Sequence, residues 1–322
     1  MESFRIKSAN HIMNYCGNLS KKDKVLFIFD DSTKDVLPYL IKAIDKVVHN
    51  IQKIKIPIMQ NHGEEPPTNV AQSMKNSTLI VALTKMSLAH TKARLKACNF
   101  GARYLSLAEY SCKILENEAI LGVDRNIEHK LNKLEKLFNL GKKVEINTAL
   151  GTKLNLDIST RTANNCPGYV TQSGDLGSPP DMEVNISPLE NMSNGRIVID
   201  GSITHPKIGL LENPVILEIK NGSIIKYSNN YEGKLIKDIM TSFKDNKVYI
   251  LAELGVGFNP RAKLNGTMLI DEGAAGCIHF GFGSNSTVGG INDVSFHLDF
   301  VMKKANLYLD EELIIQNGNL LI

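Results

Sequence analysis

A group of histidine and acidic side chains in the last quarter of the chain carries the residues best suited to chemistry. Glu253 follows an apolar run, His279 lies within residues 277–281, and one residue separates His297 from Asp299. On a β-strand, residues i and i+2 share a face and lie about 7 Å apart, so His297 and Asp299 point the same way. Imidazole and carboxylate together suit zinc, manganese, cobalt or ferrous iron. The pattern predicts a metal site built from neighbouring strands.

Further acidic residues could join this site. Glu183 lies in a proline-rich stretch with Asp181 and precedes Glu190, and spacing alone does not choose among the three. Glu272 belongs to another acidic segment. The structural alternative is that the His-x-Asp pair is only a histidine hydrogen-bonded to a carboxylate. A buried carboxylate such as that expected at Glu253 is costly without a partner. The presence of three histidine or acid positions in one glycine-rich segment favours the metal.

The residues around this group alternate between apolar and polar, which is typical of strands with one buried face. Glycine turns separate the short runs, and the Asn-Gly pair at 221–222 is a hairpin signal. A helix is predicted at residues 232–242. Strands are predicted at residues 144–146, 154–158, 197–201, 215–219 and 248–251.

The first half of the chain has continuous apolar runs separated by amphipathic stretches, a pattern typical of parallel strands covered by helices on both faces. Apolar residues at 127, 131, 134 and 138 then predict a helix that ends near Gly141. The predicted strands are residues 25–29, 51–58, 79–83 and 102–107, and the predicted helices are residues 33–48 and 87–99.

Together these patterns predict an α/β plus β-rich (α+β) fold. An N-terminal α/β domain with a parallel sheet is expected over residues 1–143. A mainly antiparallel β domain that carries the metal site is expected over residues 144–322. The length of 322 residues agrees with two domains of about 150 residues each.

Composition and charge narrow the function classes. No apolar run reaches about 18 residues, and the five cysteines form no C-x-x-C pair, so neither a membrane span nor a disulfide framework is expected. Residues 1–143 carry 23 basic and 14 acidic side chains, but the two kinds are interspersed, which does not favour nucleic acid. P-loop, nucleophile-elbow and zincin motifs are absent. We expect a cytoplasmic protein with no nucleic-acid or membrane partner.

The acids and histidines of the second half resemble those of the aminopeptidase T (leucyl aminopeptidase) metallopeptidase family. That family has an acid in a Pro-rich Glu-Val stretch, a second acid, a histidine and a terminal His-x-Asp. Here these correspond to Glu183, Glu253, His279, and His297 with Asp299. The resemblance covers residues 150–310, and it implies that these five residues bind two metal ions, zinc, manganese or cobalt.

The same resemblance implies a hydrolase that removes N-terminal amino acids from small peptides, or cleaves a related amide, with a metal-activated water. Glu272 would be the catalytic acid that binds the free amine of the substrate. Ser286 stands where the family has a tyrosine near the metals, and losing such a donor to the oxyanion can cost about 3–4 kcal/mol. A homodimer is implied by the resemblance alone.

A related branch implies different chemistry. The chain length and residues 255–262 resemble ring-cleaving 2,5-dihydroxypyridine dioxygenases, which hold one ferrous ion with a histidine plus His-x-Asp. On this alternative, His279, His297 and Asp299 would bind Fe(II) and leave positions for oxygen and a catecholic small molecule. A further ligand histidine of that branch falls at Glu253, so the ligand match favours the hydrolase. A second alternative is a non-catalytic relative whose acids bind a structural ion.

Overall fold

The computed structural model describes residues 1–321, and the chain divides into two compact units. One unit comprises Met1–Arg125 and Cys166–Pro180, and the other comprises Asn126–Asn165 together with the chain from Asp181 onward. The predicted boundary at residue 143 divides the chain at one point, whereas each observed unit is made of two stretches of chain. The observed division instead assigns the helix at Glu128–Leu140 to the second unit and returns residues 166–180 to the first.

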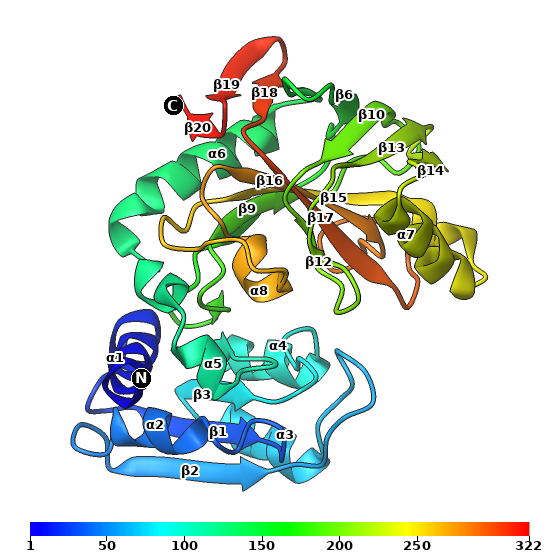
Figure 1. Cartoon of the computed structure of the whole chain (residues 1–322). Helices are drawn as coiled ribbons and strands as arrows, with labels where there is room; N and C mark the ends of the chain where they lie inside the picture. The colour runs from blue at the N-terminus through cyan, green and yellow to red at the C-terminus, as the bar shows by residue number, and fades with distance from the viewer. Residues whose placement is uncertain (322) are drawn as a thin grey trace. The chain divides into compact units, whose positions relative to one another are not determined.

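A five-stranded parallel sheet forms the centre of the first unit, as the continuous apolar runs predict (Figure 1). Its strand order is β2-β1-β3-β4-β8, and all five residues of β3 are buried. The strands are β1 (Lys24–Phe29), β2 (Asn50–Lys55), β3 (Leu79–Leu83), β4 (Arg103–Ser106) and β8 (Leu176–Gly177).

The helices of the first unit are shorter than the amphipathic pattern predicts. Pro38 stands in the first turn of α2 (Leu37–Lys42), where its fixed φ suits a helix start. Thr91 caps α4 (Lys92–Asn99) by accepting from Arg94 N, so this helix begins later than expected. The remaining helices are α1 (Glu2–Asn10), a π-helix (His11–Cys16), α3 (Thr68–Lys75), α5 (Cys112–Leu115) and a 3-10 turn (Glu118–Gly122).

The second unit contains two sheets, and every strand pair with a defined register in them is antiparallel, as predicted. The eight-stranded sheet has the order β14-β13-β10-β6-β5-β18-β19-β20. Its strands are β5 (Lys143–Asn147), β6 (Lys153–Asp157), β10 (Asn194–Ile199), β13 (Val215–Lys220), β14 (Ser223–Tyr227), β18 (Asn306–Leu309), β19 (Glu312–Gln316) and β20 (Asn319–Leu320).

The seven-stranded sheet, in the order β12-β11-β17-β16-β15-β9-β7, carries the predicted site residues. Three of its strands, β9, β15 and β16, are buried along their whole length. The strands are β7 (Asn164–Cys166), β9 (Glu183–Ile186), β11 (Ser202–Ile203), β12 (Gly209–Leu210), β15 (Leu251–Gly257), β16 (Cys277–Gly283) and β17 (His297–Lys303).

Three helices accompany these sheets: α6 (Glu128–Leu140), α7 (Tyr231–Ser242) and α8 (Met268–Asp271). The strand predicted at 248–251 is wrong at its start. Residues Asn246–Tyr249 form a 3-10 turn that Asp245 caps by accepting from Lys247 N, and β15 begins at Leu251. The α+β class is confirmed. Within residues 1–321, no helix has the length and apolar character needed to cross a membrane.

Candidate metal centre

Four adjacent strands bring the five predicted ligands together. Glu183 lies on β9, Glu253 on β15, His279 on β16, and His297 and Asp299 on β17. These strands are consecutive neighbours in the seven-stranded sheet, so residues from distant parts of the sequence meet over one region of it.

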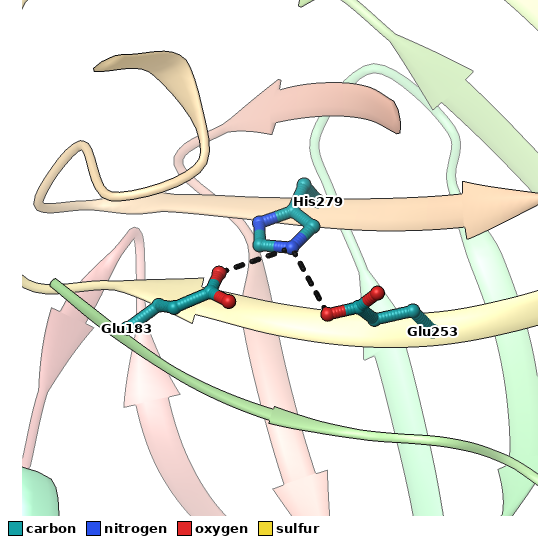
Figure 2. A group of neighbouring side chains, drawn as sticks. All are labelled: Glu183, Glu253 and His279. Atoms are coloured by element: carbon teal, nitrogen blue, oxygen red, sulfur yellow. Dashed lines mark ion pairs between the residues drawn. The ribbon is translucent and has the colours of Figure 1, made fainter. Parts of the chain in front are cut away.

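Glu253 is shared between two groups of three candidate ligands. Figure 2 shows His279 Nε2 between two carboxylates, 3.2 Å from Glu183 Oε2 and 3.8 Å from Glu253 Oε1. The other oxygen of Glu253 lies 3.3 Å from His297 Nε2, which is also 3.0 Å from Asp299 Oδ1. We call Glu183, Glu253 and His279 the inner triad, and Glu253, His297 and Asp299 the outer triad.

The two triads differ in their access to solvent. The side chains of His279 and Glu183 are 1% and 6% exposed, whereas that of His297 is 31% exposed. A small molecule from solvent can therefore approach the outer triad from the side of His297. The set of His279, His297 and Asp299, considered from the sequence, is not among the groups of converging ligand atoms in residues 1–321.

Two glycines on the strands leave room for the imidazole rings. Gly255 pairs with His279 across β15 and β16, and a Cβ at Gly255 would lie 2.0 Å from His279 Cε1. A Cβ at Gly281 would lie 2.7 Å from His297 Nε2. Any larger residue would have to displace a ring, so these glycines fix where the rings lie.

The donor set and its unpaired atoms fit a bound cation. Glu183 Oε2 and Asp299 Oδ2 are buried, and neither forms a hydrogen bond of regular geometry with a nitrogen or hydroxyl donor of residues 1–321, although His279 Nε2 lies 3.2 Å from Glu183 Oε2. Buried acceptors in native proteins almost always have a hydrogen-bond partner. A divalent ion held by imidazole and carboxylate would satisfy these oxygens and offset their negative charge.

Without an ion, the inner triad retains protons. Burial raises the pKa of Glu183 to about 7, against the opposing effect of the His279 charge. Burial lowers the pKa of His279, but the carboxylates of Glu183 and Glu253 outweigh this effect and raise it to about 9. Metal binding at these side chains must therefore displace protons.

Glu272, predicted as a catalytic acid, lies at the end of α8 beside Asp299. Burial raises the pKa of Glu272 well above its ordinary value, and the charge of Asp299 raises it further, so Glu272 keeps its proton and donates a hydrogen bond to Asp299. Burial raises the pKa of Asp299, but the charge of His297 and the hydrogen bonds from His297 and Glu272 outweigh it and lower the pKa below its usual range. Glu272 therefore acts on the outer triad through Asp299.

The structure also separates the three acids of the proline-rich stretch. Glu183 contributes to the inner triad, whereas Glu190 forms an ion pair with Arg161 at 2.5 Å. Asp181 is a member of the acidic cluster that the sequence did not select. Burial raises its pKa well above its ordinary value, and the charges of Glu183 and Glu253 add to this effect. The signal was present in the spacing, because Asp181 stands two residues before Glu183, and an extended chain would place both side chains on one face.

Comparisons with known proteins identify relatives of the whole fold. A family model for 2,5-dihydroxypyridine 5,6-dioxygenase (NicX) matches residues 8–322. The 2,5-dihydroxypyridine 5,6-dioxygenase of Pseudomonas putida KT2440 is 25% identical over 195 residues, which are 58% of this chain and 56% of that protein. The chain is thus aligned to little more than half the length of this curated relative.

Two solved structures share the fold. The structure of 2,5-dihydroxypyridine dioxygenase from Pseudomonas putida KT2440 has a TM-score of 0.84 and 19% identity, covering 100% of this chain and 98% of that one. Wild-type AmpT from Thermus thermophilus has a TM-score of 0.68 and 13% identity, with 100% of both chains covered.

These findings correct the functional prediction. The reading as a hydrolase, aminopeptidase or metallopeptidase is wrong, because the family model and the curated relative agree on a dioxygenase. The likeness to a peptidase extends to the fold alone, which AmpT shares at 13% identity. With a match that extends from residue 8 to the C-terminus, this chain belongs to the 2,5-dihydroxypyridine 5,6-dioxygenase family of enzymes.

Proposed function

We propose that the protein is an iron-dependent dioxygenase that opens the ring of 2,5-dihydroxypyridine or a closely related hydroxylated pyridine. Family membership supports the reaction class, and the convergence of two histidines and three carboxylates around Glu253 supports the metal dependence. Cleavage between C5 and C6 breaks that bond and adds both atoms of O₂ to the product. Zinc has no redox chemistry, so iron suits this reaction better than zinc.

The outer triad is the better place for the reactive ion. Glu253, His297 and Asp299 would hold it, and the exposed side of His297 gives a substrate access that the inner triad lacks. His297 Nδ1 lies 2.8 Å from the carbonyl oxygen of Ser284. Because a carbonyl only accepts, Nδ1 carries the proton and Nε2 is left to bind metal. When bound, ferrous iron would supply the one-electron chemistry that allows O₂ to react with the ring.

Two acids beside the triads would orient the Asp299 carboxylate and the substrate through hydrogen bonds. Glu272 holds Asp299 through its hydrogen bond, which fixes the direction of that carboxylate. Asp181 Oδ1 is buried and lacks a hydrogen-bond partner among residues 1–321, so it can accept a hydrogen bond from a hydroxyl or ring N–H of the substrate. A hydroxypyridine offers both kinds of donor.

The inner triad offers a place for a second divalent ion. Its imidazole and two carboxylates suit zinc, manganese or cobalt as well as iron. We expect one iron per chain to suffice for activity, because the side chains of His279 and Glu183 are buried and leave a substrate no access to the inner triad. Elemental analysis of protein purified without chelators would count the ions directly.

Oxygen consumption tests the proposed activity. Protein loaded anaerobically with Fe(II) and given 2,5-dihydroxypyridine should consume about one O₂ for each ring opened. His297→Ala should reduce the rate at least about 100-fold, since loss of a ligand is more severe than the 10- to 100-fold loss typical of an outer partner. His129→Ala, an exposed histidine on α6, is the matched control.

A different result would favour the alternative of a non-catalytic relative that binds metal. If the chain binds iron tightly but consumes no oxygen with 2,5-dihydroxypyridine or other dihydroxypyridines, the proposal fails. The protein would then be a metal-binding relative without this activity.

A further inference from the structure

The segment between the two histidine strands, residues 284–296, is closed by one buried asparagine. Asn285 is 0% exposed. Its backbone N–H donates to Asn292 O at 3.0 Å, and its side-chain Oδ1 accepts from Asn292 N at 2.7 Å. Its carbonyl accepts from Gly290 N at 2.8 Å. These bonds tie the two ends of the segment together around a single side chain.

The same asparagine attaches the segment to the rest of the unit. Asn285 Nδ2 donates to Ser187 Oγ at 2.8 Å and to Glu190 Oε1 at 2.9 Å. Arg161 pairs with the other oxygen of Glu190 and also donates to Gly289 O. The segment is therefore held at its start and in its middle by one connected polar network.

The segment ends directly on the outer triad. Ser284, the residue before Asn285, supplies the carbonyl that accepts from His297 Nδ1, and its own N–H donates to Phe296 O at 2.8 Å. Asn292 also donates to Gly283 O at 2.6 Å. A shift of this segment would move the carbonyl that orients the His297 ring.

A second chain of hydrogen bonds leads from the segment to the inner triad. Asn164 Nδ2 donates to Val288 O at 3.3 Å and to Asn185 Oδ1 at 2.9 Å. Asn185 Nδ2 in turn donates to Glu183 Oε1 at 2.6 Å. The segment thus has a polar connection to a ligand of each triad.

A glycine leaves room for the side chain of Asn285. A Cβ at Gly290 would lie 1.9 Å from the Asn285 side-chain carbon, so only glycine fits there without moving the amide. The Asn285 amide is therefore held by hydrogen-bond partners on both its oxygen and its nitrogen.

We propose that Asn285 is a positioning residue for the metal centre, acting through residues 284–296 on His297 and, more weakly, on Glu183. This inference rests on the metal centre of the proposed function and not on its substrate. Outer partners of metal-bound histidines commonly change metal affinity about 10- to 100-fold when removed. Here the outer partner of His297 is the carbonyl of Ser284. Asn285 does not contact His297 itself, but it holds the segment that carries this carbonyl.

Cobalt titration of the full-length apoprotein tests this role. Co(II) gives visible absorption bands that report both its affinity and the geometry of its ligands. Asn285→Ala should weaken Co(II) binding about 10-fold or more and alter these bands. Asn306→Ala is the matched control: Asn306 on β18 accepts from Asn317 N and donates to Asn147 Oδ1 away from the triads. It should change the affinity by less than about twofold.

Thermal unfolding of the apoprotein separates positioning from general stability. If Asn285→Ala lowers the Tm but leaves the Co(II) affinity and spectrum unchanged, the inference is wrong. If that variant does not fold, Glu190→Gln replaces it, because it keeps the side-chain volume while disturbing the Arg161 pair, and a wild-type affinity there also overturns the inference. Lack of Co(II) binding by the wild type would overturn it as well. Absence of oxygen uptake with altered Co(II) binding would instead contradict only the proposed activity.

Discussion

Glu253 is the residue on which both triads depend. Each of its oxygens faces a different histidine, at 3.8 Å from His279 and 3.3 Å from His297. Glu253→Ala should therefore weaken metal binding at least about 100-fold, more than loss of an outer partner does. Equilibrium dialysis with elemental analysis would measure this, with Glu218→Ala, a partly exposed acid on β13, as the control. Full metal occupancy in Glu253→Ala would contradict the assignment.

Residue types and spacing selected five side chains that the structure brings together, but they did not decide what these side chains do. His297 and Asp299 could be assigned to one face from the strand period alone, and the structure places them 3.0 Å apart. The reaction could not be derived, because imidazoles and carboxylates serve hydrolysis and oxygenation equally well. The position of Asn285 was also inaccessible, since its partners Ser187 and Glu190 lie about a hundred residues away.

At the scale of elements, the room for the His279 ring beside β15 depends on glycine. Gly255→Ala would place a methyl group 2.0 Å from the His279 ring. Overpacking of this kind costs about 1–3 kcal/mol, so the variant should unfold at lower temperature and lose metal affinity as the ring moves. Calorimetry and metal titration would measure both effects.

A control on the same strand distinguishes the two effects. Ala252→Gly on β15 should destabilise the strand by about 0.5–1 kcal/mol. It removes a methyl group and adds none near His279, so metal affinity should stay close to that of the wild type. Equal losses of affinity in both variants would show that the strand, and not the room for the ring, is what matters.

The junction of β5 and β6 predicts a pH-dependent contribution to stability. Burial raises the pKa of Asp157, but hydrogen bonds from Lys143, at 2.6 Å, and from Ser159 outweigh it and lower the pKa below its ordinary value of 3.8. A lowered folded-state pKa stabilises the protein above the unfolded pKa, and this is lost as the pH falls through the folded value. Asp157→Asn should cost about 1–2 kcal/mol at pH 7.

Denaturant unfolding across the pH range would measure that contribution. The difference between the wild type and Asp157→Asn should stay constant down to about pH 5 and shrink below about pH 4. A difference that persists unchanged at pH 2–3 would mean that the carboxylate charge contributes nothing.

The elements with strong periodicity were predicted most accurately. β3 and β6 match their predicted ranges to within one residue, because their apolar patterns are unbroken. Helix starts were missed where a local hydrogen bond decides them, as Thr91 does for α4. Strands of two residues, such as β8 and β11, are too short to show any period and exist only through their partners.

At the scale of the whole molecule, metal binding should stabilise the two units unequally. The ligands all belong to the second unit, and an ion that binds only the folded state at 100 times its Kd adds about 2.7 kcal/mol. Hydrogen exchange with and without metal should show increased protection in β9, β15, β16 and β17. Equal gains in β1, β3 and β4 would contradict this expectation.

The homodimer stays a prediction, which sedimentation of the full chain would test.

The first unit is built from two separate stretches of chain, and this has a consequence for synthesis. β8, at residues 176–177, pairs with β4, at residues 103–106, at the edge of the parallel sheet. While the chain leaves the ribosome, residues 107–175 must be made after β4 before its neighbour β8 exists. That later sequence includes α6, β5 and β6, which belong to the other unit. The N-terminal sheet is therefore completed only after translation of the second unit has begun, so the two halves cannot mature strictly one after the other.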